Sequence, residues 1–456
     1  MPPRPDNPSS KNRLHYWLIA ILSAMLTGGI ALFALSIILD ERPPDISAFG
    51  PPPPAVAPGI ICFNQAIAEV AKKIPGSLTD KYPPAILDRL RAEIQDMLNG
   101  KRENPYLFFI DEDYPMQEMA GGHRWEQDIA DILLQAAVAA GLWQALDEAL
   151  AAPDDPSFGW GDDKFGGLFR LSRWMTMQLR DELKKGDSAA ALHSLRRLFW
   201  LGKKLEQNAS TYGDWSVSLG IRSNACRLAG EILPELHAPP GLLCSIAADI
   251  GRFRPEAENA RTAFLGEITL INRQKDTLWP DRKYKGMDRL KDNIIFKKNQ
   301  TARLYGECCR DIMRLFAESA GNYAAIKPRA DAHEQSWAAR AKRAKKYIIN
   351  KDGWYVMEPL SNCSGHMKYF YRTGALHSLA QAALALRAWQ AGHDALPGTL
   401  EALVPACLPS VPIDYMDGNP IRYWKESGEI WTIRREDFKP EDDDLRKEYT
   451  FHLPPR

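Results

Sequence analysis

The sequence lacks most of the short motifs by which catalytic and cofactor sites are recognised. Its 456 residues contain no C-x-x-C pair, no G-x-S-x-G nucleophile motif and no G-x-x-x-x-G-K-S/T phosphate loop. His333 and Glu334 begin a zincin-like motif, but Trp337 stands where the second histidine is required. Cys363 and His366 lack the second cysteine of a haem-attachment motif. We therefore predict no bound cofactor and identify no catalytic residue by motif.

Net charge is absent as well. Lys and Arg together number 58, as do Asp and Glu, so no global field attracts nucleic acid, and we predict no nucleic-acid partner. Seven cysteines are too few for a disulfide scaffold, and their odd number leaves at least one without a partner in the chain. Hydrophobic residues make up 45% and charged residues 25%, which is ordinary globular usage, and the length predicts about two or three domains.

One long hydrophobic run is present, at residues 17–39, and it contains no charged residue. At about 1.5 Å per residue, a helix of this length spans the hydrocarbon core of a bilayer, about 30 Å thick. A cleaved signal peptide would have a shorter apolar region and a small-residue cleavage site, which residues 36–39 do not offer. The sequence therefore predicts an uncleaved transmembrane anchor.

The residues that flank this anchor predict its orientation. Arg4, Lys11 and Arg13 precede it, whereas two acidic residues follow it immediately. Cations favour the cytoplasmic side of a membrane. We expect residues 1–16 to be cytoplasmic and the bulk of the chain to be periplasmic, in a bacterial inner membrane.

The rest of the chain divides by composition. Residues 40–59 are rich in proline and predict a semi-rigid stalk in the polyproline II conformation. Residues 60–373 predict a helical domain, and residues 374–456 a smaller C-terminal α+β module. Apolar spacings of three and four predict helices at 62–73, 84–98, 127–151, 168–185, 188–207, 216–233, 242–253, 257–272 and 375–390.

The fold class that follows is mainly α. Residues 168–207 predict two helices around a Gly-Asp turn, like one hairpin of a helical repeat, but no fixed period recurs along the chain. An irregular helical bundle is therefore the expected architecture. In the C-terminal module, residues 420–424 and 429–433 flank a turn at 426–428 and predict a β-hairpin.

The C-terminal module carries a helix, a P-x-x-L-x-x-L turn, and a run of Pro, Asp and Gly-x-Pro that enters the hairpin. This order resembles the C-terminal region of type II secretion major pseudopilins, over about residues 376–433. The matching residues are Pro397, Leu400, Leu403, Pro412, Asp414, Gly418, Pro420 and Tyr423. A similar ending occurs in large, uncharacterised membrane-anchored bacterial proteins that carry a helical domain ahead of it. The resemblance implies a small α+β fold, although the prepilin peptidase site of pseudopilins, a Gly followed by a hydrophobic run with Glu, is missing near Trp17.

Two groups of acidic residues are candidate ligand sites. Some pseudopilins hold calcium near this hairpin, so the resemblance implies that Asp414, Asp417 and Asn419 could supply oxygen ligands; the alternative is ordinary turn chemistry. Asp162 and Asp163 lie between aromatic residues and could form a carbohydrate or metal site, or could cap a loop between helices.

Together these features predict a single-pass envelope protein that acts through protein partners and contacts the bilayer through its anchor. One alternative is a membrane-tethered hydrolase that uses Asp162, Asp163 or a histidine-centred site assembled from distant segments. Another is a component of a secretion or pilus-like assembly, which the resemblance in the C-terminal module implies.

Overall fold

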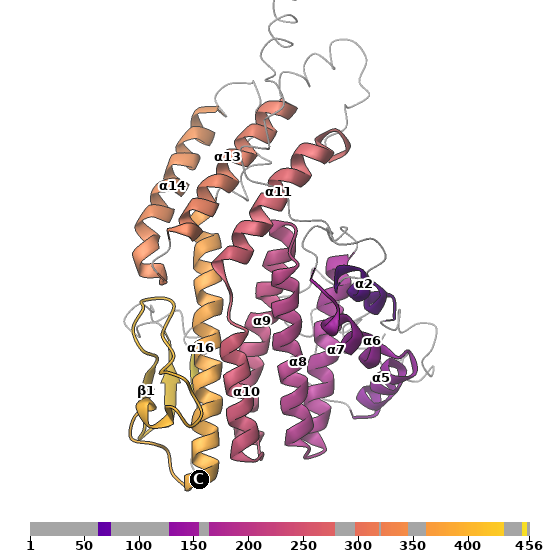
Figure 1. Cartoon of the computed structure of the whole chain (residues 1–456), viewed down its shortest axis with the longest axis vertical. Coiled ribbons are helices and arrows are strands. Elements are labelled where there is room, and N and C mark those ends of the chain that lie inside the picture. The colour runs from indigo at the N-terminus through magenta and orange to yellow at the C-terminus, as the bar shows by residue number, and fades with distance from the viewer. Residues whose placement is uncertain are drawn as a thin grey trace, which may run out of the picture. The chain divides into compact units, whose positions relative to one another are not determined.

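The computed structural model describes residues 63–73, 127–154, 164–278, 297–318, 321–344, 362–432 and 449–453. Within them the protein is mainly helical and carries a small antiparallel sheet near its C-terminus, which confirms this part of the predicted fold class (Figure 1). Among the described helices, none is both long and apolar enough to cross a membrane. Several predicted features lie outside the described residues: segment 1–16, the anchor 17–39, the stalk 40–59, the helix 84–98, and Asp162 with Asp163.

The chain divides into two compact units. The larger comprises residues 51–267, 310–332 and 363–456, and the smaller comprises residues 1–50, 268–309 and 333–362. The helices are α2 (Phe63–Lys73), α5 (Gln127–Ala139), α6 (Leu142–Ala151), α7 (Lys164–Lys184), α8 (Ser188–Gln207), α9 (Tyr212–Ile232), η3 (Leu233–Glu235), α10 (Pro240–Arg252), α11 (Ala257–Leu278), α13 (Lys298–Ala317), α14 (Tyr323–Ala344), α16 (Cys363–His393) and η4 (Leu400–Leu403). The strands are β1 (Arg422–Trp424), β2 (Glu429–Trp431) and β3 (Thr450–His452).

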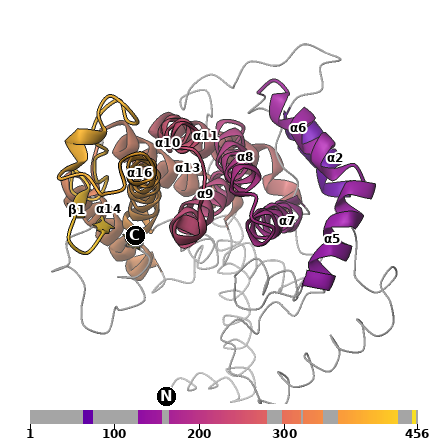
Figure 2. The same cartoon turned by 90° about the horizontal axis from the view of Figure 1, so that it is seen from below.

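Helices α7, α8, α9 and α16 form the centre of the larger unit. Each packs on the next in that order, and α10 packs against both α16 and α8, as the view from below shows (Figure 2).

The turn between α7 and α8 is the predicted Gly-Asp turn. Gly186 adopts a φ of 78°, and Asp187 caps α8 by accepting a hydrogen bond from the amide of Ala190 at 2.9 Å.

The single helix predicted over residues 127–151 is wrong. Gly141 takes a left-handed conformation, with φ 67° and ψ 30°, and separates α5 from α6. The apolar spacing continues through this glycine, so periodicity alone did not reveal the break.

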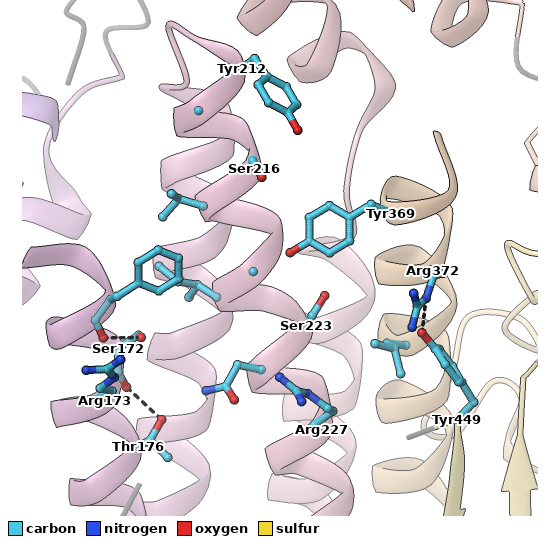
Figure 3. Close-up of a pocket in the computed structure, with 17 residues that line it drawn as sticks. Ser172, Arg173, Thr176, Tyr212, Ser216, Ser223, Arg227, Tyr369, Arg372 and Tyr449 are labelled. Carbon is cyan, nitrogen blue, oxygen red and sulfur yellow. Dashed lines mark hydrogen bonds between the residues drawn. The ribbon is translucent and has the colours of Figure 1, made fainter. Parts of the chain in front are cut away.

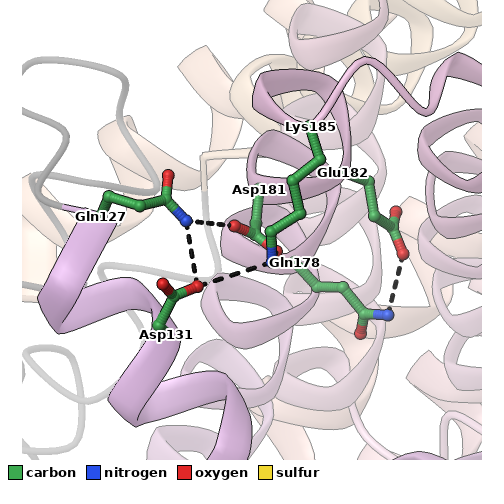
Figure 4. Close-up of polar contacts among 6 residues, drawn as sticks. All are labelled: Gln127, Asp131, Gln178, Asp181, Glu182 and Lys185. Atoms are coloured by element: carbon green, nitrogen blue, oxygen red, sulfur yellow. Dashed lines mark hydrogen bonds and ion pairs between the residues drawn. The ribbon is translucent and has the colours of Figure 1, made fainter.

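A network of polar side chains connects α5 to α7. Gln127 donates to Asp181 at 2.8 Å, and Lys185 pairs with Asp131 and Asp181 (Figure 4).

Helix α16 is much longer than the predicted 375–390. It begins at Cys363, and most of its residues are buried; in its first part Ser364, Lys368 and Arg372 form a partly exposed polar stripe. Gly374, where the C-terminal module was expected to begin, lies inside this helix. A Cβ at Gly374 would come within 2.9 Å of the Tyr415 ring, so the glycine permits close packing there.

The C-terminal residues form a three-stranded sheet in the order β1-β2-β3, with both pairs antiparallel. The predicted hairpin corresponds to β1 and β2, whereas β3 was not predicted. Phe451 of β3 packs so closely on α9 that a Cβ at Gly230 would approach its ring to 2.5 Å. A disulfide between Cys244 of α10 and Cys407, with Cα atoms 4.6 Å apart, also joins this region to the helices.

The smaller unit has its own polar contacts. Glu307 of α13 accepts hydrogen bonds from Arg303, on the same helix, and from Arg340 of α14, the latter at 3.0 Å. The Arg340 guanidinium lies 4.1 Å from the centroid of the buried Trp337 ring. Arg340 thus joins an ion pair between α13 and α14 to a cation–π contact within α14.

The core of the larger unit contains a fully buried ion pair. Arg222 of α9 and Glu206 of α8 lie 2.5 Å apart, and both side chains have 0% exposure. Their contact lacks hydrogen-bonding geometry and is therefore Coulombic, while Glu206 also accepts a hydrogen bond from the amide of Glu256 at 2.8 Å. Gly202 makes room for this pair, because a Cβ there would meet Arg222 Cγ at 2.4 Å.

We expect Glu206→Ala to lower the free energy of unfolding by about 3–5 kcal/mol, because it leaves the Arg222 charge buried and unpaired. The double variant Glu206→Leu, Arg222→Met should recover much of that loss, because no isolated charge remains. Urea unfolding of the full chain in detergent micelles measures both. The matched control is Glu231→Ala, which removes the more exposed Arg180 pair and should cost less than about 1 kcal/mol. Equal costs for the two single variants would contradict the assignment.

Candidate functional site

A cavity of about 830 Å³ lies in the larger unit between α7, α9 and α16, with Tyr449, just before β3, at one side (Figure 3). Its described lining combines arginines, phenols, hydroxyls and apolar side chains. None of these residues is a carboxylate, a histidine or a cysteine. The described lining is therefore rich in hydrogen-bond donors and contains no acidic residue.

One face of α9 forms the floor of this cavity. Tyr212, Ser216, Gly220, Ser223 and Arg227 are three or four residues apart, so they lie along a single helix face. At 1.5 Å per residue this face extends about 22 Å. Figure 3 shows a phenol at one end of it and a guanidinium at the other.

Three arginines, each from a different helix, supply the positive charge. Arg173 comes from α7, Arg227 from α9 and Arg372 from α16. Arg227 is exposed and makes no hydrogen bond or ion pair with any residue in the described part of the chain. Arg372 is held in place by Tyr449, to whose hydroxyl it donates a hydrogen bond and whose ring centroid is 5.1 Å away. The cavity is thus locally positive in a chain without net charge.

Two of the three phenols in the described lining have shifted pKa values. Burial raises the pKa of both Tyr212 and Tyr369, so both hydroxyls stay protonated at neutral pH. Tyr212 is also held by His366, whose Nδ1 lies 3.1 Å from its hydroxyl. Gly220 keeps the floor open, because a Cβ there would lie 3.3 Å from the Tyr369 hydroxyl and 3.7 Å from the ring of Phe169, which is 41% exposed.

A second, smaller cavity of about 430 Å³ brings His193 near Glu182 and Asp147. These residues do not form a relay. Asp147 pairs with Arg197 at 2.8 Å, and Glu182 accepts a hydrogen bond from Gln178 at 2.9 Å (Figure 4). His193 makes no hydrogen bond to either carboxylate within the described residues.

The proposed calcium ligands lie elsewhere, in the turn before β1. Asp414 is fully buried and accepts a hydrogen bond from the amide of Met416 at 2.9 Å, and Asp417 accepts one from the amide of Asn419 at 2.9 Å. Arg422 donates to both carboxylates. The carboxylate oxygens that calcium would need are therefore already bound to the Arg422 guanidinium. The residues as placed do not fit the ion. Within the described residues, no group of three or more His, Cys, Asp or Glu is placed to hold a metal.

The other candidate residues from the sequence lie in different parts of the structure. His333 and Glu334 lie on α14 and do not line either cavity. Cys363 is buried at the start of α16. His366 alone borders the larger cavity, through its contact with Tyr212.

Sequence reasoning missed the three arginines. Each lies on a different helix, and no local pattern shows that they converge. A signal was present on α9, where hydroxyl and phenol residues share one face with Gly220 at its middle. Such a face is otherwise typical of a solvated surface.

The chain matches no protein-family model, and no match to it was found among curated proteins or solved structures. The function is therefore inferred from the chemistry of the cavity and of the residues that support it.

Asp214 supports the start of α9, next to Gly213 and Tyr212 of the cavity. It accepts hydrogen bonds from the amide and hydroxyl of Ser210, at 3.0 and 2.9 Å, while Thr211 caps the helix. Burial raises the pKa of Asp214 to about 6, although these hydrogen bonds oppose the shift. The first turn of α9 is therefore sensitive to pH.

We expect the free energy of unfolding to fall as the pH rises from about 4 to about 6. In this window the folded protein keeps a proton on Asp214 that the unfolded chain has released, because the ordinary pKa is 3.8. The fall is at most about 3 kcal/mol and levels off above pH 6. Asp214→Asn should remove this part of the pH dependence in urea unfolding. Identical pH profiles for the variant and the wild type would contradict the assignment.

Proposed function

We propose that this chain is a single-pass envelope protein whose larger unit binds a protein partner in the cavity between α7, α9 and α16. The observation that carries the proposal is the lining itself, which joins three arginines and three tyrosines around an open floor. Arginine and tyrosine, with tryptophan, are enriched among the residues that dominate binding energy at protein interfaces. Their convergence from distant segments supports recognition of a partner.

The location rests on the anchor at residues 17–39 and the cations before it. The stalk at residues 40–59 would hold the helical units at a short distance from the bilayer. The disulfide between Cys244 and Cys407 supports a periplasmic location, because such bonds persist in oxidising compartments. Balanced charge supports the absence of a nucleic-acid partner.

The alternative of a membrane-tethered hydrolase is less well supported. Within the described residues, the lining of the larger cavity contains neither a carboxylate nor a histidine, and His366 at its border contacts the phenol of Tyr212. In the smaller cavity, Asp147 is paired with Arg197. A role in a secretion or pilus-like assembly rests on the resemblance at residues 376–433 alone.

Photo-cross-linking in cells tests the proposal. A benzophenone amino acid replaces Phe169, which is 41% exposed and lines the cavity, in the full membrane-anchored chain. We expect a defined cross-linked protein after irradiation. Protease added to spheroplasts should digest this cross-linked species, because the proposal places the cavity in the periplasm.

The matched control places the same group at Val138 of α5, which is 64% exposed and lines neither cavity. It should give no such product. The same product from both positions, or none from Phe169, would contradict binding at the cavity. Protection of the product in spheroplasts would contradict the orientation.

A further inference from the structure

We infer that the partner presents an acidic peptide segment, which lies along α9 with its carboxylates at the arginine end of the cavity. The inference rests on the proposed binding function and names the ligand class of that site. It follows from the charge, the length and the polarity of the lining.

The charge of the lining selects an anion. Arg173, Arg227 and Arg372 converge from three helices, and no carboxylate accompanies them among the described lining residues. A guanidinium binds a carboxylate through two parallel hydrogen bonds, which gives both energy and direction. Arg227 is exposed and has no hydrogen-bond or ion-pair partner within the described residues, so its donors are available to a ligand.

The length of the site selects an extended ligand. The face of α9 from Tyr212 to Arg227 measures about 22 Å. At about 3.3 Å per residue, roughly seven residues of extended peptide match that length. A single small anion would contact only the arginine end.

The polar groups in the middle of the site favour a peptide over a lipid as the ligand. Ser216, Ser223 and Asn224 offer donors and acceptors along the floor, and these match the alternating N–H and C=O groups of a peptide backbone. An acyl chain would offer no hydrogen-bonding group to them, although Ser223 also bonds to Thr373, at 3.0 Å. Phe169 and Leu376 provide apolar contacts beside them, so we expect an aromatic or apolar residue to follow the acidic ones.

Fluorescence anisotropy with the full chain in detergent micelles tests the inference. The probe is a fluorescein-labelled heptapeptide of four acidic residues followed by Phe-Ala-Phe. We expect Arg227→Gln to weaken its binding about tenfold or more, because a charge-assisted hydrogen bond is lost. Replacing the acidic residues by their amides should weaken binding at least as much. The matched control, Arg343→Gln, changes an exposed arginine on α14 outside the cavity and should have no effect.

Equal affinity for the acidic and amide peptides, or no effect of Arg227→Gln, would overturn the inference. So would Arg227-dependent binding of phosphatidylglycerol vesicles or inorganic phosphate together with no binding of the peptide. The chain also carries four consecutive acidic residues at 441–444, close in sequence to Tyr449. Because these residues could compete with the peptide, the assay is repeated with a variant of the chain in which all four are changed to their amides. If the peptide binds neither the wild type nor this variant, the inference is overturned.

The two proposals fail separately. If the cross-link from Phe169 is absent, the binding function itself fails. If that cross-link forms but the acidic peptide does not bind, only the ligand class is wrong.

Discussion

The buried ion pair between Arg222 and Glu206 is the interaction on which the larger unit depends. Two charges at 0% exposure tolerate almost no displacement, because each would otherwise be isolated in a medium of low dielectric constant. The pair fixes α9 against α8 where Gly202 allows close approach, and Glu206 also holds the amide of Glu256 ahead of α11. One contact thus sets the positions of three segments.

The same contact fixes the rotation of α9. Successive residues of a helix are about 100° apart, so directing Arg222 into the core turns the face of Gly220, Ser223 and Arg227 away from it. The buried face is reinforced by Trp215, which packs against Phe264 and Phe316 at centroid distances of 5.8 and 5.7 Å. The opposite face is left to line the cavity. A core interaction therefore determines which side chains a ligand meets.

The sequence allowed the helical class, the bounds of α8 and the hairpin of β1 and β2 to be predicted, because each depends on local periodicity or turn chemistry. The break at Gly141 was missed because the apolar spacing continues across it. The start of α16 was missed although Ser364, Lys368 and Arg372 recur at helical spacing there, opposite buried apolar residues. The polar face of α9 is a local signal, but no local pattern shows which distant helices face it, so the cavity could not be predicted. Asp414 and Asp417 make the side-chain hydrogen bonds of tight turns, which was the alternative to calcium binding, but their partner Arg422 was not foreseen.

The central claim is that the cavity along α9 is a binding site. Hydrogen–deuterium exchange of the full chain, with and without the acidic heptapeptide, tests it most directly. The account predicts slower exchange of backbone amides in α9 and in the flanking parts of α7 and α16, with no change in α5 and α6. Protection confined to other elements, or no protection at saturating peptide, would contradict it.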